Sequence, residues 1–152
     1  MDVYCIQKHL GHGAHLLLGD SLVDDLKYRL SSEPIRAVFC EIPCNPLTRT
    51  VDLAAVAELC RRAGVPLIVD DTVGTVYNID VYPYADMVTT SLTKAISGSG
   101  EVMAGVVWGC EDSPFAERFQ TFLALDQGAP LFTNDVRALL DSSADFPERM
   151  AQ

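Results

Sequence analysis

Lysine is scarce in this chain of 152 residues, and no hydrophobic run in it is long. Only three lysines are present, and acidic residues outnumber basic ones by 21 to 11. The formal net charge of −10 argues against nucleic acid or an anionic membrane as a partner, because the field of such a chain repels polyanions. The longest apolar stretch, residues 102–109, is far too short to span a bilayer.

An export signal and a disulfide framework are also missing. Asp2, Lys8 and His9 interrupt the first apolar residues, which therefore do not resemble a signal peptide. The five cysteines are an odd number and favour reduced thiols over a network of disulfides. We therefore expect a cytoplasmic protein.

Two patterns suggest a metal site, and neither is complete. His9, His12 and His15 are spaced by three, but the glycines between them disfavour a continuous helix. No acid or cysteine cluster completes a ligand set beside them. Cys40 and Cys44 lack the second pair that a zinc site needs. We expect no bound metal.

Periodic patterns indicate the elements of a single globular unit. With 49% hydrophobic and 21% charged residues, the composition is that of one ordinary domain. The expected helices cover residues 3–10, 21–32, 50–62, 114–125 and 135–146, and the expected strands cover residues 15–18, 35–42, 66–70, 86–91 and 102–108. This order predicts an α/β fold with a mostly parallel sheet layered by helices.

One acidic and one basic side chain follow the ends of expected strands. Thr50 is expected to cap the helix at 50–62, with Gly64 at its end. The strand at 66–70 is apolar up to Asp70, which is typical of a strand covered on both faces. Ligands of parallel sheets bind beyond the carboxyl ends of the strands, where Asp70 and Lys94 are expected. This placement indicates a site.

The segment SLTKAISGSGE (residues 91–101) sets Lys94 between hydroxyl residues and a glycine-rich turn. A lysine amine becomes nucleophilic only when it is desolvated or held by neighbouring groups. Ser91 and Thr93 offer hydroxyls that suit a phosphate, and the glycines let the backbone approach a ligand closely. Asp70 at the end of an apolar strand needs a cation or a strong donor. These are the parts that pyridoxal 5'-phosphate (PLP) requires.

Spacing alone leaves a second interpretation open, in which Lys94 is a solvated loop residue and Asp70 caps the next turn. Residues 35–109 favour the first interpretation through four landmarks in order: CEIPCNP, an amphipathic helix, VDDT, and SLTKAISGSGEVMAG. Together they resemble the Cys/Met-metabolism PLP-dependent enzymes, a family that includes cystathionine γ-synthase, cystathionine lyases and methionine γ-lyase. The segment VYPYAD and residues 132–150 are most similar to the fungal cystathionine γ-synthase-like branch.

The resemblance implies a fold and a role for the lysine. The fold would be the PLP-dependent transferase fold (aspartate aminotransferase-like, fold type I), with residues 1–152 forming part of its PLP-binding large domain. The cofactor would be PLP, held by Lys94 as an internal aldimine. Once released by substrate, the same amine would carry protons between substrate carbons. Asp70 would pair with the pyridinium nitrogen.

The resemblance also implies the remaining cofactor contacts. Ser91 and Thr93 would bind the phosphate, Asn45 would hydrogen-bond the 3-hydroxyl of the ring, and Thr72 would lie beside the ring. Asp71 occupies a position where the family has Asn or Asp, and no role is assigned to it.

The implied reaction is γ-replacement on an O-acylhomoserine by a thiol such as cysteine (transsulfuration), with a small amino acid as substrate. Elimination of the cystathionine or methionine γ-lyase type is an alternative, and a non-catalytic remnant is another. Family chains are much longer, so the N-terminal part of the large domain and the C-terminal small domain are expected to be absent from residues 1–152. Family members share active sites within homo-oligomers, so association with another copy or with a full-length paralogue is expected.

Overall fold

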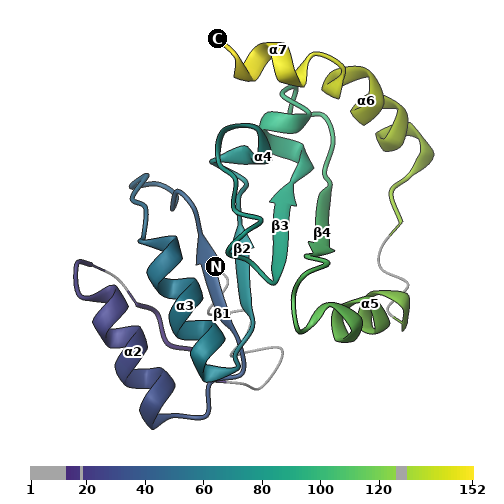
Figure 1. The fold of residues 1–152 in the computed structure, drawn as a ribbon. Coiled ribbons are helices and arrows are strands. Elements are labelled where there is room, and N and C mark those ends of the chain that lie inside the picture. Colours follow the sequence, from purple (N-terminus) through teal and green to yellow (C-terminus); the bar gives the residue numbers. More distant parts are fainter. Residues whose placement is uncertain (1–12, 18, 126–129) are drawn as a thin grey trace.

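The fold is built on one four-stranded sheet. The computed structural model describes residues 13–17, 19–125 and 130–152 (Figure 1). Strands β1 (Val38–Glu41), β2 (Leu67–Asp70) and β3 (Met87–Ser91) are parallel neighbours, and β4 (Gly105–Gly109) runs antiparallel beside β3. The described chain therefore confirms an α/β fold with a mostly parallel sheet. The strand expected at 102–108 begins later, at Gly105.

Two helices cover one face of the sheet. Figure 1 shows α2 (Leu22–Ser32) and α3 (Leu53–Ala63) side by side next to β1. Beneath them Leu67, Val69 and Val88 are completely buried and pack with Val56 and Cys60 of α3. Burial of these apolar side chains is the main stabilising contribution to the fold.

The opposite face of the sheet is largely open in the described chain. Burial alternates along β2, where Ile68 and Asp70 are only half-buried, and Phe39 in the neighbouring strand is 50% exposed. Helix α5 (Ala116–Leu125) reaches this face at one end, since Phe119 lies 3.5 Å from the position of a Cβ on Gly109. The expectation that the strand at 66–70 is covered on both faces is therefore wrong for the described residues.

Four helical segments of the described chain gather beyond the carboxyl ends of the parallel strands. They are α4 (Thr75–Asn78), the wide helical turn η1 (Leu92–Ile96), α6 (Thr133–Ser143) and α7 (Phe146–Met150). Figure 1 shows α6 and α7, in yellow, passing beyond β3 and β4. The helix expected at 135–146 is present as α6, but it ends at Ser143, before the expected boundary. Pro147 has no N–H to donate and its ring would clash with the carbonyl four residues earlier, so a new helix begins at Phe146.

The caps of α3 differ in part from the prediction. The N-cap is Asp52, whose carboxylate accepts a hydrogen bond from the N–H of Ala55 at 2.9 Å, and not Thr50. A cap must accept from an N–H two or three positions into the helix, which Asp52 can reach and Thr50 cannot. Gly64 ends the helix with a φ of +65°, as predicted.

Two elements are expected from the sequence before α2. The helix expected at 3–10 lies outside the described residues. Residues 15–17 of the strand expected at 15–18 have no regular structure. His15 there contacts α2, with Nε2 2.7 Å from Oε2 of Glu33 and Nδ1 3.0 Å from Nη1 of Arg29. Within the described part of the chain, no helix combines the length and apolarity that crossing a bilayer requires.

Candidate functional site

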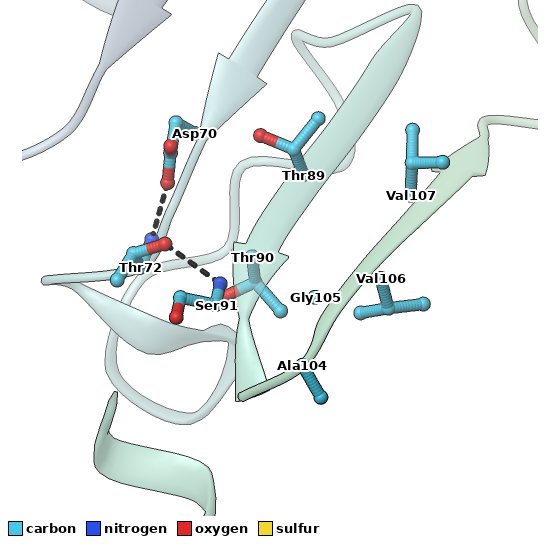
Figure 2. Close-up of a pocket in the computed structure, with 9 residues that line it drawn as sticks. All are labelled: Asp70, Thr72, Thr89, Thr90, Ser91, Ala104, Gly105, Val106 and Val107. Atoms are coloured by element: carbon cyan, nitrogen blue, oxygen red, sulfur yellow. Dashed lines mark hydrogen bonds between the residues drawn. The ribbon is translucent and has the colours of Figure 1, made fainter. Parts of the chain in front are cut away.

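An open groove of about 400 Å³ lies on the uncovered face of the sheet, at the carboxyl ends of β2 and β3. Residues 104–107 form one wall, and the polar residues of the lining are Asp70, Thr72, Thr89, Thr90 and Ser91 (Figure 2). The strand register explains this grouping, because Asp70 pairs with Thr89 and side chains at paired positions share a face. Sheet geometry thus brings an acid and several hydroxyls into one groove.

Thr72 connects the ends of the two strands. Its N–H donates to Oδ1 of Asp70 at 2.9 Å, and its Oγ1 accepts from the N–H of Ser91 at 2.8 Å (Figure 2). One oxygen of Asp70 is therefore fixed in place. Among the described residues the other oxygen, Oδ2, has no hydrogen-bond partner, so it is available to a donor in the groove. A carboxylate held in this way can bind a protonated ring nitrogen.

Lys94 belongs to the turn that follows β3. Its backbone is non-helical (φ −84°, ψ −119°), and the turn is closed by hydrogen bonds from the N–H of Ser97 to the Leu92 carbonyl at 2.9 Å and from the N–H of Gly98 to the Lys94 carbonyl at 2.8 Å. The side chain is exposed and does not line the groove. No group of the described chain forms a hydrogen bond or ion pair with its amine. The cofactor role of Lys94 stays a prediction.

The structure separates the predicted site residues into two sets. Asp70, Thr72 and Ser91 meet in the groove, whereas Asn45, Thr93 and Lys94 lie outside its lining. The Thr93 hydroxyl is bound to the backbone of Ala104: it donates to the carbonyl at 3.3 Å and accepts from the N–H at 2.9 Å.

Asn45 lies beyond the end of β1. Its side chain is exposed, and its N–H donates to Oε2 of Glu41 at 3.2 Å. Because β1 is parallel to β2, Asn45 and Asp70 belong to the same edge of the sheet. No hydrogen bond within the described residues joins Asn45 to the groove.

Sequence reasoning missed Thr89, which lines the groove beside Asp70. The period of two along β3 was the available signal, because Thr89 and Ser91 must face the same side. The sequence also indicated Asp70, at the end of an apolar strand, as the buried acid, and this prediction is wrong. Asp70 is half-buried, whereas Asp71 is 1% exposed and neither of its oxygens has a hydrogen-bond partner in the described chain.

The Asp71 carboxyl lies on the covered side of the sheet. Burial raises its pKa above the ordinary value, and the charge of Asp70 adds to the rise, while the nearby Thr90 hydroxyl opposes it. The two neighbouring acids thus point to opposite faces because successive side chains alternate at a strand end.

Thiols and histidines of the described chain form no metal centre. Across residues 13–17, 19–125 and 130–152, no group of three or more His, Cys, Asp or Glu is placed to hold an ion. Burial raises the pKa of the Cys40 thiol to about 11, with Cys44 and Glu41 adding to the effect. A thiol that stays protonated at neutral pH is a poor nucleophile.

Comparison with known proteins supports the family resemblance noted in the sequence. The sequence profile of the Cys/Met metabolism PLP-dependent enzymes matches residues 13–140. Cystathionine gamma-synthase of Saccharomyces cerevisiae is 38% identical over 152 residues, which cover 97% of this chain and 24% of the relative. Cystathionine gamma-synthase-like protein ankD of Aspergillus thermomutatus is 36% identical over 92% of this chain and 24% of its own length. The chain therefore spans about a quarter of these relatives.

A solved structure confirms the fold. The crystal structure of metB from Corynebacterium glutamicum superimposes with a TM-score of 0.76 at 22% identity, covering 94% of this chain and 37% of the other. This likeness supports the expected fold type I architecture. The family itself is shown by the matching profile and by the sequence relatives. The chain belongs to the Cys/Met metabolism PLP-dependent enzymes.

Proposed function

We propose that this chain forms part of the PLP site of a cystathionine γ-synthase-like enzyme. The proposed reaction replaces the γ-substituent of an O-acylhomoserine with a thiol such as cysteine. The observation that carries the proposal is the Asp70 carboxylate, fixed by Thr72 through one oxygen and open to the groove through the other. The names of the fungal relatives support the choice of γ-replacement.

The residues present fit the cofactor. A half-buried carboxylate with a free oxygen suits the protonated nitrogen of a pyridine ring. Hydroxyls of Thr72, Thr89 and Ser91 line the same groove and suit phosphate and ring oxygens. When bound, PLP supplies an electron sink for the carbanion formed on the substrate.

Each predicted site residue has a defined task in this proposal. Asp70 would keep the ring nitrogen protonated, and Asn45 would hydrogen-bond the 3-hydroxyl. Thr72 would pack beside the ring, and Lys94 would hold the cofactor covalently and later move protons at its amine nitrogen.

Ser91 and Thr93 bind the phosphate. Thr93 can donate to a phosphate oxygen in place of the Ala104 carbonyl, since that bond, at 3.3 Å, is long for a hydroxyl donor. The bond that Thr93 accepts from the Ala104 N–H, at 2.9 Å, would remain and hold the side chain in place.

We further propose that residues 1–152 form a partial large domain that acts in the cytoplasm. A chain spanning a quarter of its relatives carries only part of their binding groups, so the substrate carboxylate would be bound by groups outside residues 1–152. Association with a second copy or with a full-length paralogue would provide such groups.

The cofactor proposal is tested by spectroscopy on the purified chain. Added PLP is expected to give a visible absorption band that borohydride converts to a permanent adduct, and peptide mapping should place the adduct on Lys94. Lys94→Ala should lose both signals. Lys27→Ala is the matched control, because Lys27 is an exposed lysine of α2, and it should retain them. A band of full strength in Lys94→Ala would contradict the assignment.

The reaction is tested by its products. With O-acylhomoserine and cysteine, γ-replacement gives a thioether, whereas elimination gives a 2-keto acid and ammonia without using the thiol. If the chain binds PLP at Lys94 and forms neither product, alone or mixed with a full-length relative, it is a non-catalytic remnant and the proposed activity is wrong.

A further inference from the structure

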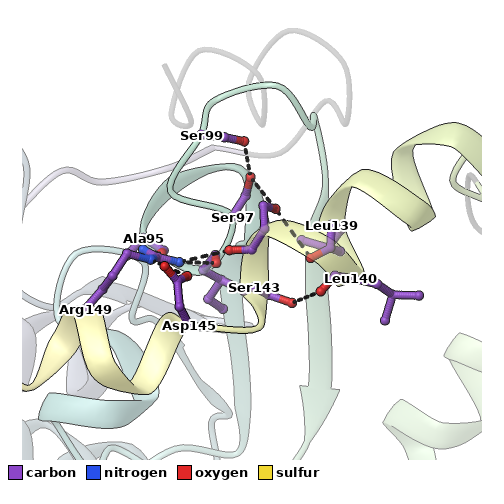
Figure 3. Close-up of polar contacts among 10 residues, drawn as sticks. Ala95, Ser97, Ser99, Leu139, Leu140, Ser143, Asp145 and Arg149 are labelled. Atoms are coloured by element: carbon purple, nitrogen blue, oxygen red, sulfur yellow. Dashed lines mark hydrogen bonds and ion pairs between the residues drawn. The ribbon is translucent and has the colours of Figure 1, made fainter.

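The guanidinium of Arg149, in α7, binds the turn that carries Lys94. Nη1 donates to the carbonyl of Ala95 at 2.7 Å (Figure 3), and Nη2 donates to the carbonyl of Ile96 at 2.9 Å. These are the last carbonyls of η1, where a helical turn has no backbone donor of its own to offer. Arg149 therefore acts as a C-terminal cap supplied from a distant part of the chain.

The arginine is itself fixed in position. Its Nε donates to Oδ1 of Asp145 at 2.8 Å, Nη2 also reaches the Ser142 carbonyl at 3.3 Å, and the side chain is only 27% exposed. Ser142 adds a hydrogen bond from its hydroxyl to that of Ser97 at 3.3 Å. A planar guanidinium held on one side by α6 and α7 presents a rigid fork to the turn on the other side.

Gly98 makes this close approach possible. Its φ is +70°, and a Cβ at this position would lie 2.6 Å from Nη1 of Arg149 and 2.8 Å from Cζ. A side chain here would displace the guanidinium as well as strain the backbone.

We propose that Arg149 is a positioning residue for Lys94, an inference that rests on the proposed function. Within the described chain the amine of Lys94 has no hydrogen-bonding or ionic partner, so its location depends on the backbone of η1. Arg149 holds the two carbonyls that follow Lys94 and so keeps the turn in one conformation. Displacing a reacting group by about 1 Å can cost on the order of a hundredfold in rate.

The first measurement needs no cofactor. Hydrogen exchange of the peptide covering residues 92–100 is compared between the parent chain and Arg149→Met, which keeps an unbranched stem and removes the guanidinium donors. Charge-assisted hydrogen bonds of this kind lower the equilibrium constant for opening of a turn by about tenfold or more. We expect exchange in this peptide to become about tenfold faster, with Arg149→Lys intermediate because a flexible ammonium lacks the rigid planar fork of the guanidinium.

The second measurement follows covalent attachment of PLP at Lys94, trapped with borohydride at a series of times. Arg149→Met should slow attachment about tenfold, and Arg149→Lys should restore part of the rate. Arg137→Gln is the matched control, since Arg137 is an exposed arginine of α6 for which the described residues show no hydrogen bond or ion pair. Asp52→Ala, which removes the cap of α3 far from the turn, controls for a general loss of stability.

The outcomes separate the inference from the proposed function. Failure of the parent chain to attach PLP at Lys94 would overturn both. Attachment in the parent chain, with equal rates and equal exchange in Arg149→Met, would overturn the positioning role alone, as would equal slowing by Asp52→Ala. If circular dichroism shows that Arg149→Met is unfolded, Arg149→Lys and Gly98→Ala are used in its place. An attachment rate equal to that of the parent chain in both variants would overturn the inference. Slow attachment in both variants would support it.

Discussion

Two adjacent carboxylates illustrate how local geometry assigns different chemistry to the same residue type. Asp70 faces the open groove, and its Oδ1 accepts a backbone N–H. Asp71 faces the covered side of the sheet and is 1% exposed, and neither of its carboxylate oxygens has a hydrogen-bond partner in the described chain. An unpartnered buried carboxylate is costly to ionise, so Asp71 is a source of instability next to the proposed cofactor ligand.

Replacing Asp71 with asparagine is expected to stabilise the fold at neutral pH. Burial raises the pKa of Asp71 in the folded state above its ordinary value of 3.8, so at pH values between the unfolded and the folded pKa the folded chain binds a proton that the unfolded chain has released. Stability contributed by the protonated form is therefore present at low pH and is lost as pH rises through the folded pKa. The amide that replaces the carboxyl in Asp71→Asn carries no charge, and the free energy of unfolding at pH 7 should rise by about 1–3 kcal/mol.

Urea titrations from pH 4 to pH 8 measure this effect. The parent chain should lose stability relative to Asp71→Asn as pH increases across that range. Asp141→Asn, a change at an exposed acid of α6, serves as the control and should follow the parent. A constant difference between parent and Asp71→Asn at every pH would show that Asp71 does not titrate with folding.

At the scale of elements, residue spacing and residue type predicted the helices and strands whose ends depend on nearby residues. Helix α2 begins one residue from the expected boundary, α3 ends at Gly64 as expected, and β2 and β3 fall within their predicted ranges. These elements follow from apolar periodicity and turn residues that lie within a few positions of each other.

The sequence could not predict contacts made over long separations. Arg149 and the Ala95 carbonyl are 54 positions apart, and nothing in either segment specifies that they meet. The antiparallel direction of β4 depends on the path of the chain after the lysine turn, which apolar patterning does not encode. The groove lining was predicted only where a motif carried it, as for Asp70 and Ser91, and Thr89 was missed.

The cap of α3 provides a direct test at this scale. Asp52→Ala removes the carboxylate that accepts the Ala55 N–H and should lower the free energy of unfolding by about 1 kcal/mol. Thr50→Ala, at the position that the sequence alone favoured, should change it by less than about 0.5 kcal/mol. Thermal or urea unfolding of the two variants measures both values, and a larger loss from Thr50→Ala would reverse the assignment.

At the scale of the whole molecule, the groove exists only when the sheet is complete. Its lining comes from the end of β2, the following turn, β3 and β4, which the chain brings together from residues 70, 72, 89–91 and 104–107. The face that carries it is open in the described chain, with Phe39 50% and Val107 37% exposed. An unfolded chain retains its lysine amines and lacks this arrangement of acid and hydroxyls.

PLP is therefore expected to stabilise the folded chain by mass action. A ligand that binds only the folded state raises the free energy of unfolding by about 2.7 kcal/mol at a concentration about one hundred times its Kd. Unfolded chains also react with aldehydes through their lysines, so pyridoxal, which has the aldehyde and lacks the phosphate, is the necessary control. Urea unfolding at increasing concentrations of each compound should show a progressive rise with PLP and little change with pyridoxal. Equal effects of the two compounds would mean that amine chemistry alone, without the groove, accounts for the binding.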